Sequence, residues 1–216
     1  MEANLIARSK PRSGLPRRAL LGGLTGALLS WPRRSPSAML PVSIIEVSAA
    51  PGASTGILRF ANFHMSCSLG WSGIRENKRE GDGASPEGTF ALRELRYRAD
   101  RIPPPRTGLA VHQTRPDDGW CDSPSDANYN RLVKLPYRAS TERLWRADHL
   151  YDALLVVGYN DSPVTPGAGS AIFLHLAAEV NGKLQPTAGC VALRYPDFLT
   201  VAAACTPETR VHIFAA

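Results

Sequence analysis

Two residues near the end of the 216-residue chain have types and spacing suited to nucleophilic chemistry. Cys190 lies in the string PTAGCVAL, and His175 ends the apolar run AIFLH fifteen residues earlier. The thiolate is the reactive form of cysteine, and a neighbouring imidazole lowers the pKa of a thiol below its free value of about 8.5. Gly189 permits the unusual backbone conformation of a turn that presents a nucleophile. The pair predicts a thiol nucleophile with a histidine base, although the spacing alone also fits a small buried cysteine.

The elements that must position this pair are short β-strands. Beyond residue 42, apolar runs of a few residues alternate with clusters of Gly, Pro, Asp and Asn, which is typical of a β-sandwich or barrel. One helix is expected over residues 196–205, because a proline suits the first helical turn and Thr206-Pro207 ends it. We therefore predict a mainly β fold of mixed strands with one or two short helices. The predicted strands are 42–47, 57–60, 65–69, 89–95, 109–112, 154–159, 171–176, 190–193 and 210–214.

Two segments between these strands read as loops. Residues 101–108 contain three successive prolines, which cannot donate the hydrogen bonds of a sheet. Residues 116–130 are rich in Asp, Ser, Pro and Asn and show no sustained period, so we expect a long loop carrying Trp120.

The basic charge of the chain is concentrated at its beginning. The net charge is +6, and residues 1–38 hold seven basic side chains against one acid, so the rest of the chain is electrically neutral. Because the rest of the chain is neutral and has no stripe of basic residues, we do not predict a nucleic acid as a partner.

The same 38 residues are laid out like an export signal. A basic stretch ending in Arg17 and Arg18 precedes an apolar stretch, residues 19–31, and then small residues and prolines. The apolar stretch has thirteen residues, fewer than the roughly twenty that span a bilayer. The string PRRALLGG resembles a twin-arginine signal. We expect a periplasmic protein with an export signal in residues 1–38, and the alternative is an uncleaved N-terminal anchor as the only link to a membrane.

The four cysteines are not equivalent in a compartment where disulfides form. Cys190 must stay reduced to act as a nucleophile, and Cys205 lies on the predicted helix, where a buried thiol is unremarkable. Cys67 and Cys121 are left as a possible disulfide.

Five strings in order along the chain resemble the YkuD-type L,D-transpeptidase family, in its branch of stand-alone periplasmic catalytic domains. The resemblance implies one catalytic domain over residues 43–216, with His175 as base, Cys190 as nucleophile, and Thr187 and Gly189 at the hydroxyl and glycine positions of the motif. The strings are KREGDGASPEGTF (78–90), GWCDSPSDANYNRLVKLP (119–136), LYDALLVVGYN (150–160), GSAIFLH (169–175) and TAGCVAL (187–193).

The motif T-A-G-C-V-A-L departs from the pattern of the family at two positions. Ala188 stands where a histidine is usual, and Ala192 where an asparagine or arginine is usual. Nucleophile and base are retained, so these departures bear on donor recognition, on the oxyanion hole and on the linkage formed.

The resemblance also implies contacts with the stem peptides of peptidoglycan. Cys190, His175 and Gly189 are the expected catalytic residues, and backbone N–H groups of residues 188–190 are the expected oxyanion donors. No metal or soluble cofactor is expected, since no spacing of ligand residues resembles a metal site. The expected substrate-binding residues are Thr187, Ala188, Arg194, Tyr159, Asn160, Ser85 and Trp120.

The predicted activity is cross-linking of stem peptides through a Cys190 thioester, with a 3-3 or a 1-3 linkage. Two alternatives remain open at this point. The same thiol could serve an L,D-endopeptidase or amidase, in which water replaces the acceptor amine. The losses at Ala188 and Ala192 also leave room for a non-catalytic peptidoglycan-binding protein.

Overall fold

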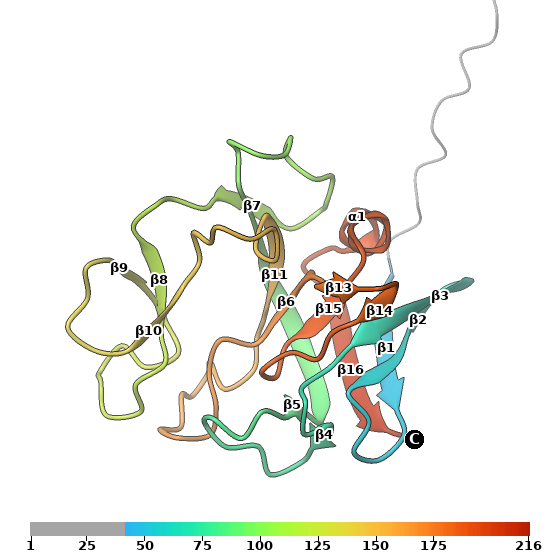
Figure 1. Ribbon diagram of the computed structural model, residues 1–216, viewed down its shortest axis with the longest axis horizontal. Helices are drawn as coiled ribbons and strands as arrows, with labels where there is room; N and C mark the ends of the chain where they lie inside the picture. Colours follow the sequence, from blue (N-terminus) through green and yellow to red (C-terminus); the bar gives the residue numbers. More distant parts are fainter. Residues whose placement is uncertain (1–41) are drawn as a thin grey trace, which may run out of the picture. The chain divides into compact units, whose positions relative to one another are not determined.

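The computed structural model describes residues 42–216, and the predicted export segment therefore lies outside the described residues. Within them, the largest sheet has nine strands in the order β11-β12-β15-β3-β2-β1-β16-β6-β7 (Figure 1). β11 also pairs with β6, which closes the sheet into a barrel. The strands are β1 (Ile44–Ala49), β2 (Thr55–Phe60), β3 (Phe63–Ser68), β6 (Gly88–Tyr97), β7 (Ala110–Gln113), β11 (Ala153–Val157), β12 (Phe173–Leu176), β15 (Val191–Leu193) and β16 (Arg210–Ala215).

This barrel confirms the predicted mainly β fold. Each of the nine predicted strands overlaps one strand of the large sheet. The sheet is mixed, since β1–β16, β12–β15 and β6–β7 are parallel pairs and the others are antiparallel. The predicted helix is α1 (Tyr195–Ala204), with Pro196 in its first turn. In the part of the chain that the structure describes, no helix is long and apolar enough to cross a membrane.

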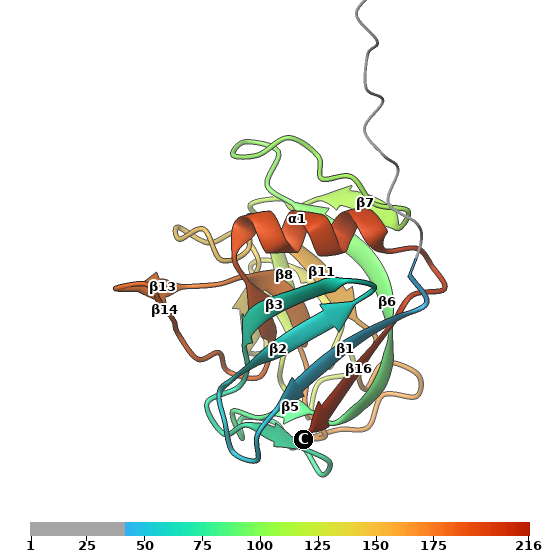
Figure 2. The ribbon, with the colours of Figure 1, turned by 90° about the vertical axis from the view of Figure 1, so that its right-hand side faces the viewer.

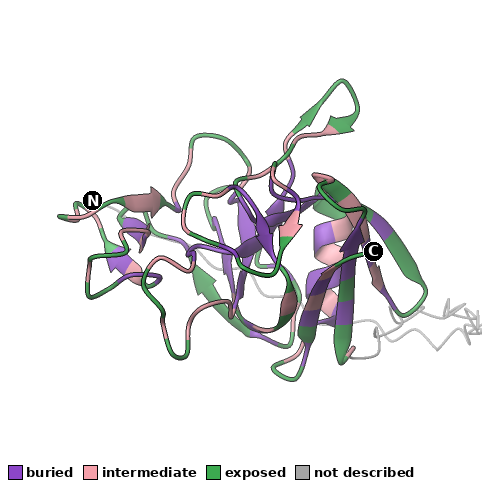
Figure 3. Ribbon diagram, turned by 90° about the horizontal axis from the view of Figure 1, so that it is seen from below, coloured by how far each residue is buried: buried purple, intermediate pink, exposed green. Residues whose placement is uncertain are grey.

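One apolar core fills the barrel. Inward-facing side chains such as Ile45, Val47 and Leu58 are fully buried, because alternate residues of a strand point to opposite faces of the sheet. α1 lies across one end of the barrel and adds Phe198 and Val201 to this core (Figure 2). Buried residues follow the strands and one side of α1, whereas much of the loops is exposed (Figure 3).

Outside the barrel, three small sheets organise the long connections. β8 (Asp118–Cys121) pairs with β9 (Leu132–Lys134) and β10 (Thr141–Arg143). β4 (Ile74–Arg75) pairs with β5 (Ser85–Pro86), and β13 (Glu179–Val180) with β14 (Lys183–Leu184). The prediction of an uninterrupted loop over residues 116–130 is therefore wrong. β8 is a four-residue strand whose partners come later in the chain, so its own sequence carries no alternating pattern.

The possible disulfide between Cys67 and Cys121 is absent. All four cysteines, which belong to the described residues, are free. Cys67 lies on β3 in the core of the barrel, whereas Cys121 lies on β8 in the three-stranded sheet.

Candidate active site

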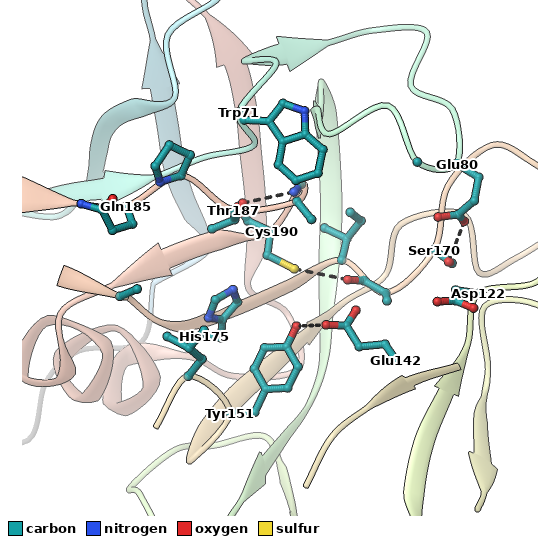
Figure 4. Close-up of a pocket in the computed structure, with 18 of the residues that line it drawn as sticks. Trp71, Glu80, Asp122, Glu142, Tyr151, Ser170, His175, Gln185, Thr187 and Cys190 are labelled. Atoms are coloured by element: carbon teal, nitrogen blue, oxygen red, sulfur yellow. Dashed lines mark hydrogen bonds between the residues drawn. The ribbon is translucent and has the colours of Figure 1, made fainter. Parts of the chain in front are cut away.

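Cys190 and His175 come from neighbouring parallel strands. His175 on β12 lies opposite Ala192 on β15, and Cys190 directly precedes β15. Because side chains alternate along a strand, Cys190 and Ala192 face the same side of the sheet as Phe173 and His175. The base and the thiol are thus diagonal neighbours, and Figure 4 shows both at one cavity.

The face that carries them is the outer side of the barrel wall. Phe173 and Cys190 belong to a second apolar cluster, separate from the barrel core to which Leu174 and Val191 belong. The remaining buried members of this second cluster are Leu144, Tyr151, Leu154, Val156 and Ala171. The loops and the three-stranded sheet therefore cover Cys190 from outside, while the barrel supports it from inside.

A cavity of about 350 Å³ opens over the thiol. Cys190 and His175 are only 6% and 5% exposed, and both line it. Within residues 42–216, no group of three or more His, Cys, Asp or Glu side chains is arranged to hold a metal ion. The lining contains two basic residues, Lys78 and Arg146, and three acidic residues, Glu80, Asp122 and Glu142.

The thiol of Cys190 is protonated in this resting structure. Its sulfur donates to the Ala171 carbonyl at 3.3 Å and accepts from the Phe173 amide at 3.4 Å. Burial, together with the nearby charge of Glu142, raises the pKa of Cys190 to about 12. A base must therefore remove the proton as the sulfur attacks.

His175 is oriented to serve as that base. Its Nδ1 lies 2.8 Å from the Leu176 carbonyl oxygen, which can only accept, so Nδ1 carries the hydrogen and Nε2 keeps the lone pair. Burial lowers the pKa of His175 to about 4, although the hydrogen bond to Leu176 opposes the shift. The imidazole is thus neutral at neutral pH.

Tyr151 and Glu142 form a second pair beside the base. The Tyr151 ring meets His175 edge-on with 5.0 Å between centroids, and its hydroxyl donates to the Glu142 carboxylate. Burial raises the pKa of Glu142, although the bond from Tyr151 opposes the shift. Figure 4 shows the pair on the side of the cavity opposite Thr187.

The turn before Cys190 is held by the side chain of Thr187. Its Oγ1 donates to the Cys190 carbonyl at 2.6 Å and accepts from the Gly189 amide at 3.1 Å. Gly189 has φ +143°, and a Cβ there would lie 2.8 Å from the Ala84 carbonyl oxygen. The predicted motif residues Thr187, Ala188 and Gly189 therefore lie together with Cys190 at the cavity.

Five predicted substrate-binding residues lie outside the lining of this cavity: Ser85, Trp120, Tyr159, Asn160 and Arg194. Ser85 is fully buried, and its hydroxyl accepts from the Gly70 amide at 3.0 Å. Arg194 forms an ion pair with Glu179 at 2.8 Å, which ties it to the β13–β14 hairpin rather than to the thiol. The contact of Arg194 with substrate stays a prediction.

The other three residues, Trp120, Tyr159 and Asn160, belong to one hydrogen-bond network. Trp120 Nε1 donates to Asn130 Oδ1 at 2.9 Å, and Asn130 Nδ2 donates to the carbonyls of Tyr159 and Asn160. Asn160 in turn donates to the Gly169 carbonyl at 2.8 Å. This network holds the loops in position relative to one another. In this structure the three residues therefore determine the shape of the loops and do not line the cavity above the thiol.

Several lining residues were missed from the sequence. Lys78 and Tyr151 lie within strings that carry the family resemblance. That resemblance is the one feature of the sequence that could have indicated them as site residues. Trp71, Glu142 and Arg146 lie outside those strings, and no spacing of residue types marks them.

Comparison with known proteins agrees with this geometry. The model of the YkuD family, described as the L,D-transpeptidase catalytic domain, matches residues 55–213. We found no significant match among curated proteins or among solved structures. The matched segment covers well over half of the chain, from β2 into β16, and includes His175 and Cys190. The chain therefore belongs to the YkuD family of L,D-transpeptidase catalytic domains.

Proposed function

We propose that the protein cross-links peptidoglycan stem peptides through a Cys190 thioester. The observation that carries this proposal is that His175 on β12 and Cys190, directly before the adjacent strand β15, line one cavity within a YkuD domain. A thiol with a neutral imidazole beside it has the parts needed for acyl transfer.

The first half of the reaction forms the acyl-enzyme. His175 Nε2 takes the proton of Cys190 as the sulfur attacks the carbonyl carbon of an L-to-D peptide bond. The proton then passes to the leaving nitrogen, the C–N bond breaks, and a thioester joins the donor stem to the sulfur.

The second half runs the same steps in reverse with a different amine. The side-chain amine of a diaminopimelate on a neighbouring stem attacks the thioester, and His175 accepts its proton. The C–S bond breaks, the Cys190 thiolate leaves and takes that proton from His175, and a new amide joins the two stems.

The turn before Cys190 limits which amides serve the oxyanion. The Gly189 amide is already bonded to Thr187 Oγ1, so the amides of Ala188 and Cys190 are the proposed donors. In comparable sites, loss of one donor costs about 3–4 kcal/mol in transition-state free energy. The mixed charges of the cavity also suit a substrate that presents both ammonium and carboxylate groups.

The decisive experiment incubates the domain with purified muropeptides and identifies the products by mass spectrometry. Dimers made by the wild type and not by Cys190→Ala support the proposal, and fragmentation assigns the 3-3 or 1-3 linkage. Cleavage that depends on Cys190 without dimers identifies a hydrolase instead. Absence of turnover in both proteins favours a binding role and contradicts the proposal.

We also propose that the domain acts in the periplasm after twin-arginine export. The proposal rests on the basic and apolar layout of residues 1–38. Replacing Arg17 and Arg18 together by lysine is expected to leave the protein in the cytoplasmic fraction. N-terminal sequencing of the wild type then distinguishes a cleaved signal from an anchor, and periplasmic recovery of the double variant would contradict the export route.

A further inference from the structure

A buried ammonium lies beside the catalytic turn. Lys78 belongs to the loop between β4 and β5, and its side chain is 3% exposed. Lysine is almost never buried without a partner, and here Nζ pairs with Asp82 Oδ1 at 2.8 Å. Asp82 is itself fixed by the amides of Arg79 and Ala84. The positive charge is therefore held at one place in the loop.

This ammonium faces the turn that carries the nucleophile. Lys78 lines the same cavity as Cys190, and its Nζ lies 3.5 Å from the position that a Cβ would take on Gly189. An ammonium has three hydrogens. Lys78 donates to Asp82 and, at 3.3 Å, to the Arg79 carbonyl, and no third acceptor meets it among residues 42–216.

The surroundings of Cys190 otherwise disfavour a negative sulfur. His175 is neutral, and the buried carboxyl of Glu142 opposes a second negative charge. The positive charge of Lys78 acts in the opposite direction and lowers the pKa of Cys190. The titratable and charged groups around the thiol are Lys78, Glu80, Asp122, Glu142, Arg146, Tyr151 and His175.

We propose that Lys78 is a positioning residue whose fixed ammonium, held by Asp82 against the Gly189 turn, stabilises negative charge on the Cys190 sulfur. Lys78 does this through space, without contact to the reacting bond. The inference rests on Cys190 being the nucleophile of the proposed function. Under this proposal, the reactivity of Cys190 depends on the loop residue Lys78, although the barrel alone positions Cys190 and His175.

The test measures the reactivity of Cys190 without any peptidoglycan substrate. Iodoacetamide alkylates the thiolate, which displaces iodide, and mass spectrometry follows the peptide that contains Cys190. At pH values well below the pKa of the thiol, Lys78→Met is expected to slow alkylation severalfold, because loss of the positive charge raises the pKa of Cys190 and lowers the thiolate fraction. Lys78→Arg keeps the charge and is expected to retain most of the wild-type rate.

Two further variants make the outcome decisive. Lys183→Met removes the same charge from the β13–β14 hairpin, away from the cavity lining, and is expected to leave the rate unchanged. The double variant Lys78→Met with Asp82→Asn removes both charges of the ion pair. Its alkylation rate tests the proposal if Lys78→Met alone fails to fold. A wild-type rate in folded Lys78→Met, or in the folded double variant Lys78→Met with Asp82→Asn, overturns the proposal, and so does an equal loss in Lys183→Met.

The alkylation experiment and the cross-linking experiment can fail independently of each other. If the wild type forms dimers and Lys78→Met alkylates at the wild-type rate, only the role of Lys78 fails. If alkylation depends on Lys78 but muropeptides are not turned over, the cross-linking function fails and the charge effect stands.

Discussion

The two walls of the cavity are built by different forces. The barrel wall holds Cys190 and His175 through the ladder of β12 and β15 and an apolar core beneath it. The loop wall holds Lys78, Glu80 and Asp122 on segments outside the large sheet. Cys190 and His175 thus lie on the barrel wall, and the charged side chains of Lys78, Glu80 and Asp122 lie on the loop wall.

Polar contacts dominate the loop wall. The hydroxyl of Tyr129 and that of Ser170 both donate to the Glu80 carboxylate. Asp118, nearly buried on β8, accepts from Lys134 at 2.7 Å and Arg96 at 3.3 Å. We expect substitutions in the barrel to act mainly on folding, and substitutions in the loops to act mainly on substrate binding.

The largest expected effect comes from the barrel core. Phe198 on α1 is fully buried, and Phe198→Ala is expected to lower the free energy of unfolding by about 3–5 kcal/mol through lost contacts and a cavity. Urea denaturation measures the change. Phe63 on β3 is 39% exposed, and Phe63→Ala is the control, with an expected loss below about 1 kcal/mol. Equal losses would show that α1 is not part of the stabilising core.

The barrel wall should also lose stability in acid through His175. Burial lowers its pKa from an ordinary value of 6.5 to about 4 in the folded protein, so between these values the unfolded chain binds the extra proton. The stabilisation that His175 contributes is therefore fully present above about pH 6.5 and is lost as the pH falls toward 4, by roughly 3 kcal/mol for a shift of this size.

The check compares unfolding free energies of the wild type and His175→Gln from pH 7 to pH 4. The part of the decline due to His175 should vanish in the variant, which cannot titrate. A matched control is His64→Gln, since His64 is exposed on β3 and should keep the wild-type slope. Parallel curves for wild type and His175→Gln would contradict the buried neutral imidazole.

The junction of the two walls gives a smaller effect. Gly189→Ala would place a Cβ 2.8 Å from the Ala84 carbonyl at φ +143°, and we expect a loss of about 2–3 kcal/mol with reduced alkylation of Cys190. Gly182 in the β13–β14 turn has φ +74° with open space around it, so Gly182→Ala measures the backbone cost alone, about 1 kcal/mol. Equal losses in the two variants would mean that the contact with Ala84 relaxes freely.

The same contrast explains how much of the fold could be predicted from the sequence. The strands of the barrel each bury one face against a single core, so apolar runs bounded by turn residues marked all nine. β4, β5, β13 and β14 have two residues each, which is too short to show a period. Their pairing is set by surrounding contacts, and a local pattern cannot reveal it.

The site divides along the same line. Thr187, Gly189 and Cys190 form a contiguous turn, so one motif located them, and a strand end located His175. The loop wall instead combines residues from distant segments whose side chains converge only after folding. Tyr159 is an example, because its hydroxyl donates to the Ala168 carbonyl, a contact that no local pattern reveals. Its contact with substrate stays a prediction.

The smallest predicted effect falls on the loop wall, at Trp71. Its indole is 58% exposed, lines the cavity, and lies against Gly83, where a Cβ would come within 2.0 Å of the ring. Trp71→Ala should change the free energy of unfolding by less than about 0.5 kcal/mol, because little buried surface is lost. It should raise the KM for muropeptides about threefold to tenfold, since aromatic contacts are worth roughly 1 kcal/mol. Trp71→Phe is expected to restore part of the binding, and a lower kcat at unchanged KM would instead assign Trp71 to the chemical step, which would weaken the division between the two walls.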